Sequence, residues 1–118
     1  VEAKHFEPIV EGMWRGVNIP GAGTSSRAYL PGWDVCGKTG TAENRGQDHS
    51  VFMGFAPMNE PKIAVAVYVE NGGYGAVYGV PIGGLIMEQY LNGELSETSK
   101  LKADAMQQRT INYGKQKR

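Results

Sequence analysis

The first apolar pattern along the chain has the three-to-four-residue period of an α-helix. It is carried by Phe6, Ile9, Val10, Met13, Trp14 and Val17. Pro8 is tolerated in a first helical turn, and the run Asn18-Ile19-Pro20-Gly21 stops the helix. The spacing therefore predicts an amphipathic helix over residues 8–17.

Three β-strands are predicted after a glycine-rich loop, at residues 33–42, 51–56 and 62–70. Turn residues separate them, and the links are short, which favours antiparallel pairing. The third strand is apolar on both faces. It therefore indicates that layers pack on both sides of the sheet.

Helical spacing returns after the turn at residues 71–75, in a helix that ends at Gly93 and is marked by Ile82, Leu85, Ile86, Tyr90 and Leu91. This order of elements predicts an α/β fold of the α+β type, an antiparallel sheet of three strands with helices packed on it. Residues 94–118 are polar, with six basic and three acidic side chains. They are predicted to form a solvated, partly disordered basic tail.

Composition excludes several classes of function. A length of 118 residues allows one small domain, and twelve basic residues against twelve acidic ones argue against nucleic-acid binding. No group of side chains has metal-ligand spacing, and no apolar run is long enough to cross a bilayer. The single cysteine, Cys36, lies within a predicted strand and is expected to be a buried, inert thiol.

Two short patterns imitate functional sites. Asp48-His49-Ser50 contains the residue types of a catalytic triad, but consecutive strand residues point to opposite faces and cannot relay a proton. Gly73, Gly75 and Gly79 imitate a dinucleotide fingerprint, but their spacing is wrong by one residue and no second parallel strand follows. The first is interpreted as a turn acid, a strand-start histidine and an ordinary hydroxyl, and the glycines as turn and cap residues, so no cofactor is expected.

Residues 32–41 satisfy two incompatible motifs. Gly32 to Thr39 fits the phosphate loop G-x-x-x-x-G-K-[ST], whereas Lys38-Thr39-Gly40 is the K-T-G triad that one class of serine acyltransferases carries on a strand. A phosphate loop runs from a strand into a helix, but loop residues precede this segment and glycines follow it. As a strand, it alternates between two faces, Trp33, Val35, Gly37, Thr39 and Thr41 on one and Asp34, Cys36, Lys38 and Gly40 on the other. The strand interpretation is favoured.

Several further motifs follow the K-T-G triad in order. They are Thr41-Ala42-Glu43, the run from His49 to Pro57, the run from Ile63 to Val67, and Glu70-Asn71-Gly72-Gly73. Over about residues 5–93 the chain resembles class B penicillin-binding proteins, and within that class the elongation-type peptidoglycan transpeptidases of the penicillin-binding protein 2 group. The resemblance implies that residues 1–93 are the C-terminal portion of a transpeptidase domain with the fold shared by serine β-lactamases.

This resemblance also implies a reaction and a role for each K-T-G residue. The reaction is acyl transfer on the D-alanyl-D-alanine end of peptidoglycan stem peptides, blocked covalently by β-lactams. Lys38 would place a positive charge near the acylation site, while Thr39 and Thr41 would bind the substrate carboxylate. The Thr41 amide would form half of an oxyanion hole, and Gly40 would let the substrate main chain approach the strand.

The family's nucleophile motif, S-x-x-K, and its S-x-N motif are missing where they are expected. Ser99-Lys100-Leu101-Lys102 matches the first pattern, but it follows the K-T-G strand and lies in the polar tail, so it is interpreted as chance. The 118-residue chain is therefore expected to be inactive alone. The parent enzyme is expected on the periplasmic side of the bacterial inner membrane, with an anchor in an N-terminal part removed before Val1.

The expected partners are the stem peptide, β-lactams and the missing N-terminal part. A strand of that part would pair with residues 62–70, and the same edge, left open, would join two copies into a homodimer. Two alternatives stay open. One is a non-catalytic module that holds a peptide carboxylate on the Lys38 strand, and the other is a phosphate-loop nucleotide hydrolase.

Overall fold

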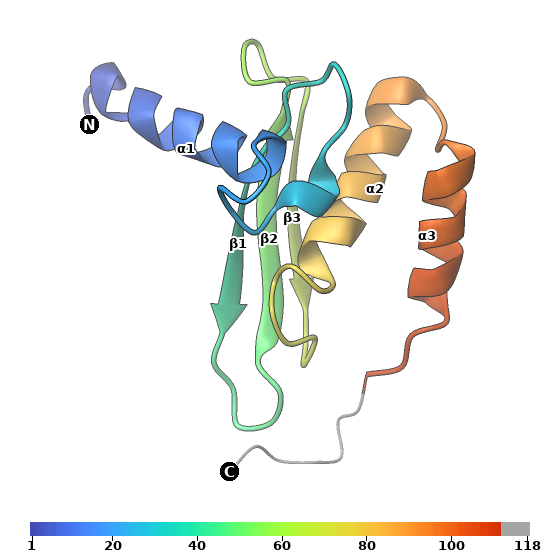
Figure 1. The fold of residues 1–118 in the computed structure, drawn as a ribbon. Helices are drawn as coiled ribbons and strands as arrows, with labels where there is room; N and C mark the ends of the chain where they lie inside the picture. Colours follow the sequence, from blue (N-terminus) through green and yellow to red (C-terminus); the bar gives the residue numbers. More distant parts are fainter. Residues whose placement is uncertain (112–118) are drawn as a thin grey trace.

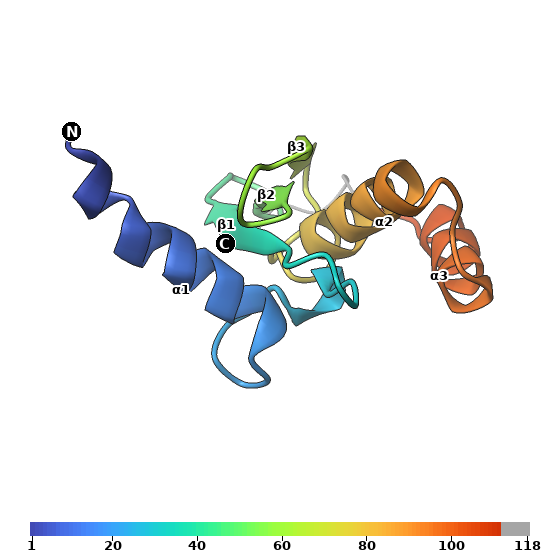
Figure 2. The same ribbon diagram turned by 90° about the horizontal axis from the view of Figure 1, so that it is seen from above.

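The computed structural model describes residues 1–111 (Figure 1). A three-stranded sheet carries two of the helices beside it, and a third helix follows the last of these (Figure 2). The elements are the short 3-10 helices η1 (Ala3–His5) and η2 (Ser26–Ala28), the helices α1 (Glu7–Asn18), α2 (Gly79–Asn92) and α3 (Glu97–Gln107), and the strands β1 (Cys36–Ala42), β2 (His49–Ala56) and β3 (Ile63–Val69). The predicted α+β fold is confirmed.

The sheet has the order β1-β2-β3, and both pairs are antiparallel. In this register Phe52 lies opposite Thr39 on one side and opposite Val67 on the other. Directly paired residues share a face of the sheet. The face that carries Phe52 therefore also carries Thr39 and Val67, and α2 packs against β2 and β3.

Phe52 is the centre of the core and has no solvent-exposed surface. Its ring occupies space left by glycines on three elements. A Cβ atom would lie 2.5 Å from the ring if added to Gly37 of β1 or to Gly83 of α2, and 2.8 Å away if added to Gly54 of β2. Because a side chain at any of these positions would meet the ring, the glycines set how closely α2 approaches the sheet.

The first strand begins later than predicted. β1 starts at Cys36, whereas the alternation predicted a strand from residue 33. Asp34 has a φ of 46°, in the left-handed region, which interrupts an extended chain. The predicted alternation is therefore wrong for residues 33–35. Trp33 instead donates a hydrogen bond from Nε1 to Asn92 Oδ1 at 2.7 Å, which joins this turn to the end of α2.

The prediction that the sheet is covered on both faces is wrong within residues 1–111. Ile63, Val65 and Val67 pack against the core, but the alternate residues of β3 are exposed. Tyr68, one of these, keeps 60% of its surface accessible. Apolar composition on both faces of a strand identifies surfaces that can be buried, and here only one is buried by the described part of the chain.

The predicted polar tail contains a helix that the sequence did not indicate, because α3 covers Glu97–Gln107. Ser96 is its N-cap, and its Oγ accepts a hydrogen bond from Ser99 N at 3.1 Å. The helix is polar and has only a weak apolar stripe, which explains why periodicity did not reveal it. Residues 112–118 of the predicted tail lie outside the described part of the chain.

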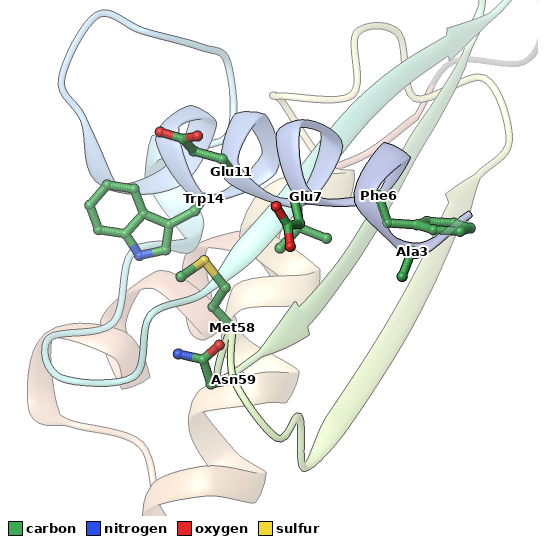
Figure 3. A pocket seen from close by; sticks show the side chains of 8 residues that line it. Ala3, Phe6, Glu7, Glu11, Trp14, Met58 and Asn59 are labelled. Atoms are coloured by element: carbon green, nitrogen blue, oxygen red, sulfur yellow. The ribbon is translucent and has the colours of Figure 1, made fainter. Parts of the chain in front are cut away.

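The C-terminal end of helix α1 lies beside β1, and the N-terminal end of this helix extends away from the sheet (Figure 1). Trp14 Nε1 donates to Asp34 Oδ1 at 3.0 Å, and Asn18 Nδ2 donates to Val35 O at 2.8 Å. A cavity of about 560 Å³ opens between this helix and the β2–β3 turn; Phe6, Trp14 and Met58 line it, and Trp14 lies beside Met58 (Figure 3). The predicted helix over residues 8–17 is confirmed.

Candidate active-site strand

The K-T-G residues lie on β1, the edge strand that pairs with β2 alone among the described strands. Thr39 pairs with Phe52 and Thr41 with Ser50, so both threonines are on the face that α2 covers. Lys38 and Gly40 alternate with them and lie on the opposite face. The predicted sharing of one face by Thr39 and Thr41 is therefore found in the structure.

Thr39 has a hydroxyl partner that the sequence did not indicate. Its Oγ1 lies 2.7 Å from Thr24 Oγ1, and either oxygen can be the donor. The loop that carries Thr24 is tied to α1, because Ser25 N donates to Gly16 O at 3.2 Å. Sequence reasoning assigned residues 18–26 only as a loop. The hydroxyl-rich run Thr24-Ser25-Ser26 was the one indication available.

Thr41 accepts a hydrogen bond from the segment that connects β3 to α2. Gly75 N donates to Thr41 Oγ1 at 3.4 Å. A Cβ added to Gly75 would lie 2.6 Å from Val51 O and 2.7 Å from Gly40 O, so the main chain passes directly over the sheet here. Since the Thr41 oxygen accepts this bond, its hydroxyl proton remains available to another acceptor.

Lys38 is exposed on the other face of β1. Its Nζ donates to Thr39 O at 2.8 Å, and no carboxylate within residues 1–111 forms an ion pair with it. Gly40 is half-buried, but a Cβ there would lie 3.5 Å from its nearest neighbour, Val51 Cβ, which is an ordinary contact. Packing within the described chain therefore does not require glycine at this position.

Residues of the triad-like run Asp48-His49-Ser50 and of the S-x-x-K match at Ser99 have structural roles. Ser50 Oγ donates to Tyr74 O at 2.9 Å and accepts from Gly79 N at 3.0 Å, while His49 Nδ1 accepts from Asn71 N at 3.0 Å. Ser99 of the S-x-x-K pattern is buried and donates from Oγ to Glu88 Oε1 at 2.5 Å. Neither serine is presented to a substrate, as expected from their sequence context.

Cys36, at the start of β1, has no exposed surface. Burial raises the pKa of the Cys36 thiol to about 11, and the negative charge of Asp34 adds to the effect. A thiol with a raised pKa carries little of the reactive thiolate at neutral pH. The prediction of a buried cysteine is confirmed, and the direction of the pKa shift agrees with an unreactive thiol.

The phosphate-loop alternative does not fit this geometry. Lys38 and Thr39 lie within β1, and the chain turns from β1 into the antiparallel strand β2 without an intervening helix. A phosphate loop requires a helix directly after the lysine and threonine, because the helix N-terminus supplies the anion-binding amides. The strand interpretation of residues 36–42 is confirmed.

Solved structures share this arrangement of sheet and helices. Pseudomonas aeruginosa PBP2 in complex with WCK 5153 matches with a TM-score of 0.64 and 36% identity, over 82% of this chain and 22% of that one. Helicobacter pylori penicillin-binding protein PBP2, in a complex with MreC, matches with a TM-score of 0.63 and 25% identity, over 80% and 19%. The fold is that of part of a penicillin-binding transpeptidase domain.

Sequence comparison defines the family. Residues 1–88 match the family model of the penicillin binding protein transpeptidase domain, and the chain belongs to this family. The peptidoglycan D,D-transpeptidase MrdA of Haemophilus influenzae is 30% identical over 123 residues, which cover 90% of this chain and 19% of that protein. PbpA of Mycobacterium tuberculosis is 42% identical over 79 residues, 58% of this chain and 16% of the relative.

The chain thus spans about a fifth of the length of these relatives, and it is similar to the penicillin-binding protein 2 type of transpeptidase domain. The resemblance inferred from the motifs is confirmed. Within residues 1–111, no helix combines the length and the apolar character that a membrane span requires.

Proposed function

We propose that this chain supplies the substrate-binding strand of a peptidoglycan D,D-transpeptidase, with Thr39 and Thr41 as ligands of the substrate's terminal carboxylate. The observation that carries the proposal is the pair of threonine hydroxyls on one face of an edge strand, each held by a defined neighbour. Two hydroxyl donors at alternate strand positions match the two oxygens of a carboxylate.

The hydrogen bonds around these threonines support donation to an anion. The Gly75 N–H donates to the Thr41 hydroxyl oxygen, so the hydroxyl proton of Thr41 stays free to donate to another group. When Thr24 donates to Thr39, the Thr39 proton is free as well. A bound carboxylate favours this arrangement, because hydrogen bonds to a charged acceptor are the stronger ones.

Lys38 and the Thr41 amide would serve the reacting end of the substrate. Lys38 carries a positive charge that no carboxylate of residues 1–111 neutralises, as a group near developing negative charge requires. The main-chain N–H of Thr41 would donate to the oxyanion that forms when the carbonyl is attacked. Packing against the described residues would allow a methyl group at Gly40. The absence of a side chain there would instead leave the strand surface clear for the substrate main chain.

The nucleophile would come from another part of the protein. The single S-x-x-K pattern here contains Ser99, whose hydroxyl is bound to Glu88, and no S-x-N pattern occurs in the sequence. The parent enzyme would act on stem peptides ending in D-alanyl-D-alanine, be acylated by β-lactams, and work in cell-wall synthesis on the periplasmic side of the inner membrane. This chain alone would not be acylated.

Covalent labelling by a fluorescent penicillin tests the proposal. The chain is incubated alone and joined to the N-terminal portion of a transpeptidase domain that carries S-x-x-K and S-x-N. Label in the joined protein only supports the proposal, and label on the chain alone would contradict it. In the joined protein, T39V and T41V should each slow labelling by about 10- to 100-fold, the value of a hydrogen bond to a charged group. T110V, at an exposed threonine away from β1, is the matched control.

The second candidate is a non-catalytic module that holds a peptide carboxylate on the same strand. It is favoured by the absence of an exposed S-x-x-K serine within residues 1–111. This candidate predicts that the joined protein binds a D-alanyl-D-alanine peptide reversibly but takes no penicillin label. The labelling experiment therefore separates the two functions.

A further inference from the structure

A cavity of about 730 Å³ lies on the far side of α2 from the sheet, between α2, α3 and the segment around η2. None of the K-T-G residues lines it. Its α3 wall begins beyond residue 88, where the match to the transpeptidase family model ends. The cavity is therefore separate from the strand site described above.

Among the described residues, three cationic side chains line this cavity: Arg27 from η2, Lys102 from α3 and Arg109 just after α3. None of them forms an ion pair within residues 1–111. Arg27 Nη1 makes only a long hydrogen bond to Ala76 O, at 3.5 Å, and the Arg109 guanidinium lies 5.1 Å from the centre of the Tyr78 ring. Their charges are thus available to an anion that enters the cavity.

Glu88 is the single acidic residue among the described residues of the lining, and its carboxylate is already engaged. Oε1 accepts from Ser99 Oγ at 2.5 Å, and Oε2 accepts from Ser96 N at 2.8 Å. Glu88 is 7% exposed and fixes the start of α3 against α2. It therefore serves to hold the wall in place and offsets only one of the three positive charges.

The rest of the lining is largely apolar and includes Leu30, Val77, Leu85 and Met106. A cavity of this size with apolar walls and a few charged groups matches the general character of small-molecule sites. We propose that it binds an amphipathic anion, in which an apolar body packs against these walls and a single carboxylate or phosphate head meets Arg27, Lys102 and Arg109. Such a head occurs both on a free fatty acid and on an anionic lipid.

The test is calorimetric titration of the 118-residue chain with decanoate below its micelle concentration. Decanol, which lacks the charge, and acetate, which lacks the apolar body, are the ligand controls. Decanoate should bind at least tenfold more tightly than either control. K102Q should weaken decanoate binding by about two- to fivefold, the range for one solvent-exposed charge pair, and the R27Q/K102Q/R109Q variant by about 10- to 100-fold.

K100Q is the matched protein control. Lys100 lies on the same helix but pairs with Glu97 at 3.3 Å and does not line the cavity, so decanoate affinity should be unchanged. Equal affinity of the wild type and the triple variant would overturn the proposal. If the triple variant fails to fold, methyl NMR of the wild type decides: shifts at Leu85 and Met106 on decanoate binding support the site, and shifts elsewhere only overturn it.

Vesicles of phosphatidylcholine with and without phosphatidylglycerol identify the source of the head group. Binding of decanoate in solution assigns a free amphiphile. If the protein sediments only with the vesicles that contain phosphatidylglycerol, and this binding is lost in the triple variant but kept in K100Q, the ligand is assigned as a lipid. Binding to neither would overturn the proposal. Penicillin labelling does not enter these measurements, so this result is independent of the proposed transpeptidase role.

Discussion

The hydroxyl oxygens of Thr24 and Thr39 lie 2.7 Å apart, although fourteen residues, which include the start of β1, separate them in sequence. This pair connects the loop after α1 to the strand that carries the candidate carboxylate site. Because a hydroxyl has one proton, the direction of the hydrogen bond in this pair determines whether Thr39 can donate to a substrate.

We therefore expect T24V, in a protein that contains the complete transpeptidase domain, to weaken substrate binding. T24V leaves the Thr39 proton free but removes the hydrogen bond that orients this hydroxyl. A D-alanyl-D-alanine peptide should therefore show a KM raised by about two- to tenfold, the value of one neutral hydrogen bond, with a smaller change in kcat. T24S keeps the hydroxyl and should restore the KM. Equal KM values for T24V and the wild type would show that Thr24 has no part in orienting Thr39.

Gly75 and Gly40 provide a matched pair of alanine substitutions. A methyl group at Gly75 would meet Val51 O at 2.6 Å and Gly40 O at 2.7 Å, so G75A should lower the free energy of unfolding by about 1–3 kcal/mol. G40A meets no atom closer than 3.5 Å and should change it by less than about 1 kcal/mol. Urea unfolding measures both, and equal effects would contradict the close approach of residue 75 to the sheet.

Glu88 should control the attachment of α3. E88A leaves the buried Ser99 hydroxyl without its acceptor and should destabilise α3 by about 1–3 kcal/mol. Hydrogen exchange of the amides in residues 97–107 should accelerate more than exchange in β2. E97A is the control, because Glu97 is exposed and makes only a surface ion pair with Lys100. Unchanged exchange in E88A would show that other contacts hold the helix.

Cys36 should make stability depend on alkaline pH. Below pH 9 the thiol is protonated in both the folded and the unfolded chain. Between pH 9 and about 11 the unfolded chain loses this proton while the folded chain keeps it, so the free energy of unfolding should fall, by roughly 2–3 kcal/mol at most. The difference between the wild type and C36A, measured by denaturant unfolding from pH 8 to 11, removes the common contribution of tyrosine and lysine. A constant difference would contradict the raised pKa.

The exposed edge of β3 should cause self-association of the isolated chain. Within the described residues, β3 pairs on one side only, with β2. Unpaired main-chain groups on such an edge can bind a second strand. Sedimentation velocity over a range of concentrations should therefore show dimers or larger species, and addition of the N-terminal portion of the domain should reduce them. A stable monomer at high concentration would contradict this prediction.

Local rules predicted the regular elements well. The apolar periodicity located α1, α2, β2 and β3, and the strand alternation correctly placed Thr39 and Thr41 on the same face of β1. These predictions succeeded because burial of one face imposes a period on the sequence. The start of β1 was missed because the left-handed conformation of Asp34 belongs to a single residue and leaves no periodic pattern.

The contacts that complete the site depend on distant parts of the chain. Thr24 meets Thr39 only because a loop folds back against α1, and Gly75 meets Thr41 only because the segment after β3 crosses the sheet. Helix α3 was missed for a related reason. Its attachment depends on Glu88, a buried carboxylate on another helix, and not on an apolar stripe of its own.

The Phe52 ring, enclosed by Gly37, Gly54 and Gly83, makes these four positions interdependent. In a library of single substitutions, each glycine should tolerate change as poorly as the phenylalanine, although none of the three belongs to the K-T-G segment. Paired libraries should differ, because a smaller residue at position 52 opens the space that alanine at position 83 would fill. Related chains that have lost the aromatic ring are therefore the ones expected to carry side chains at these glycine positions.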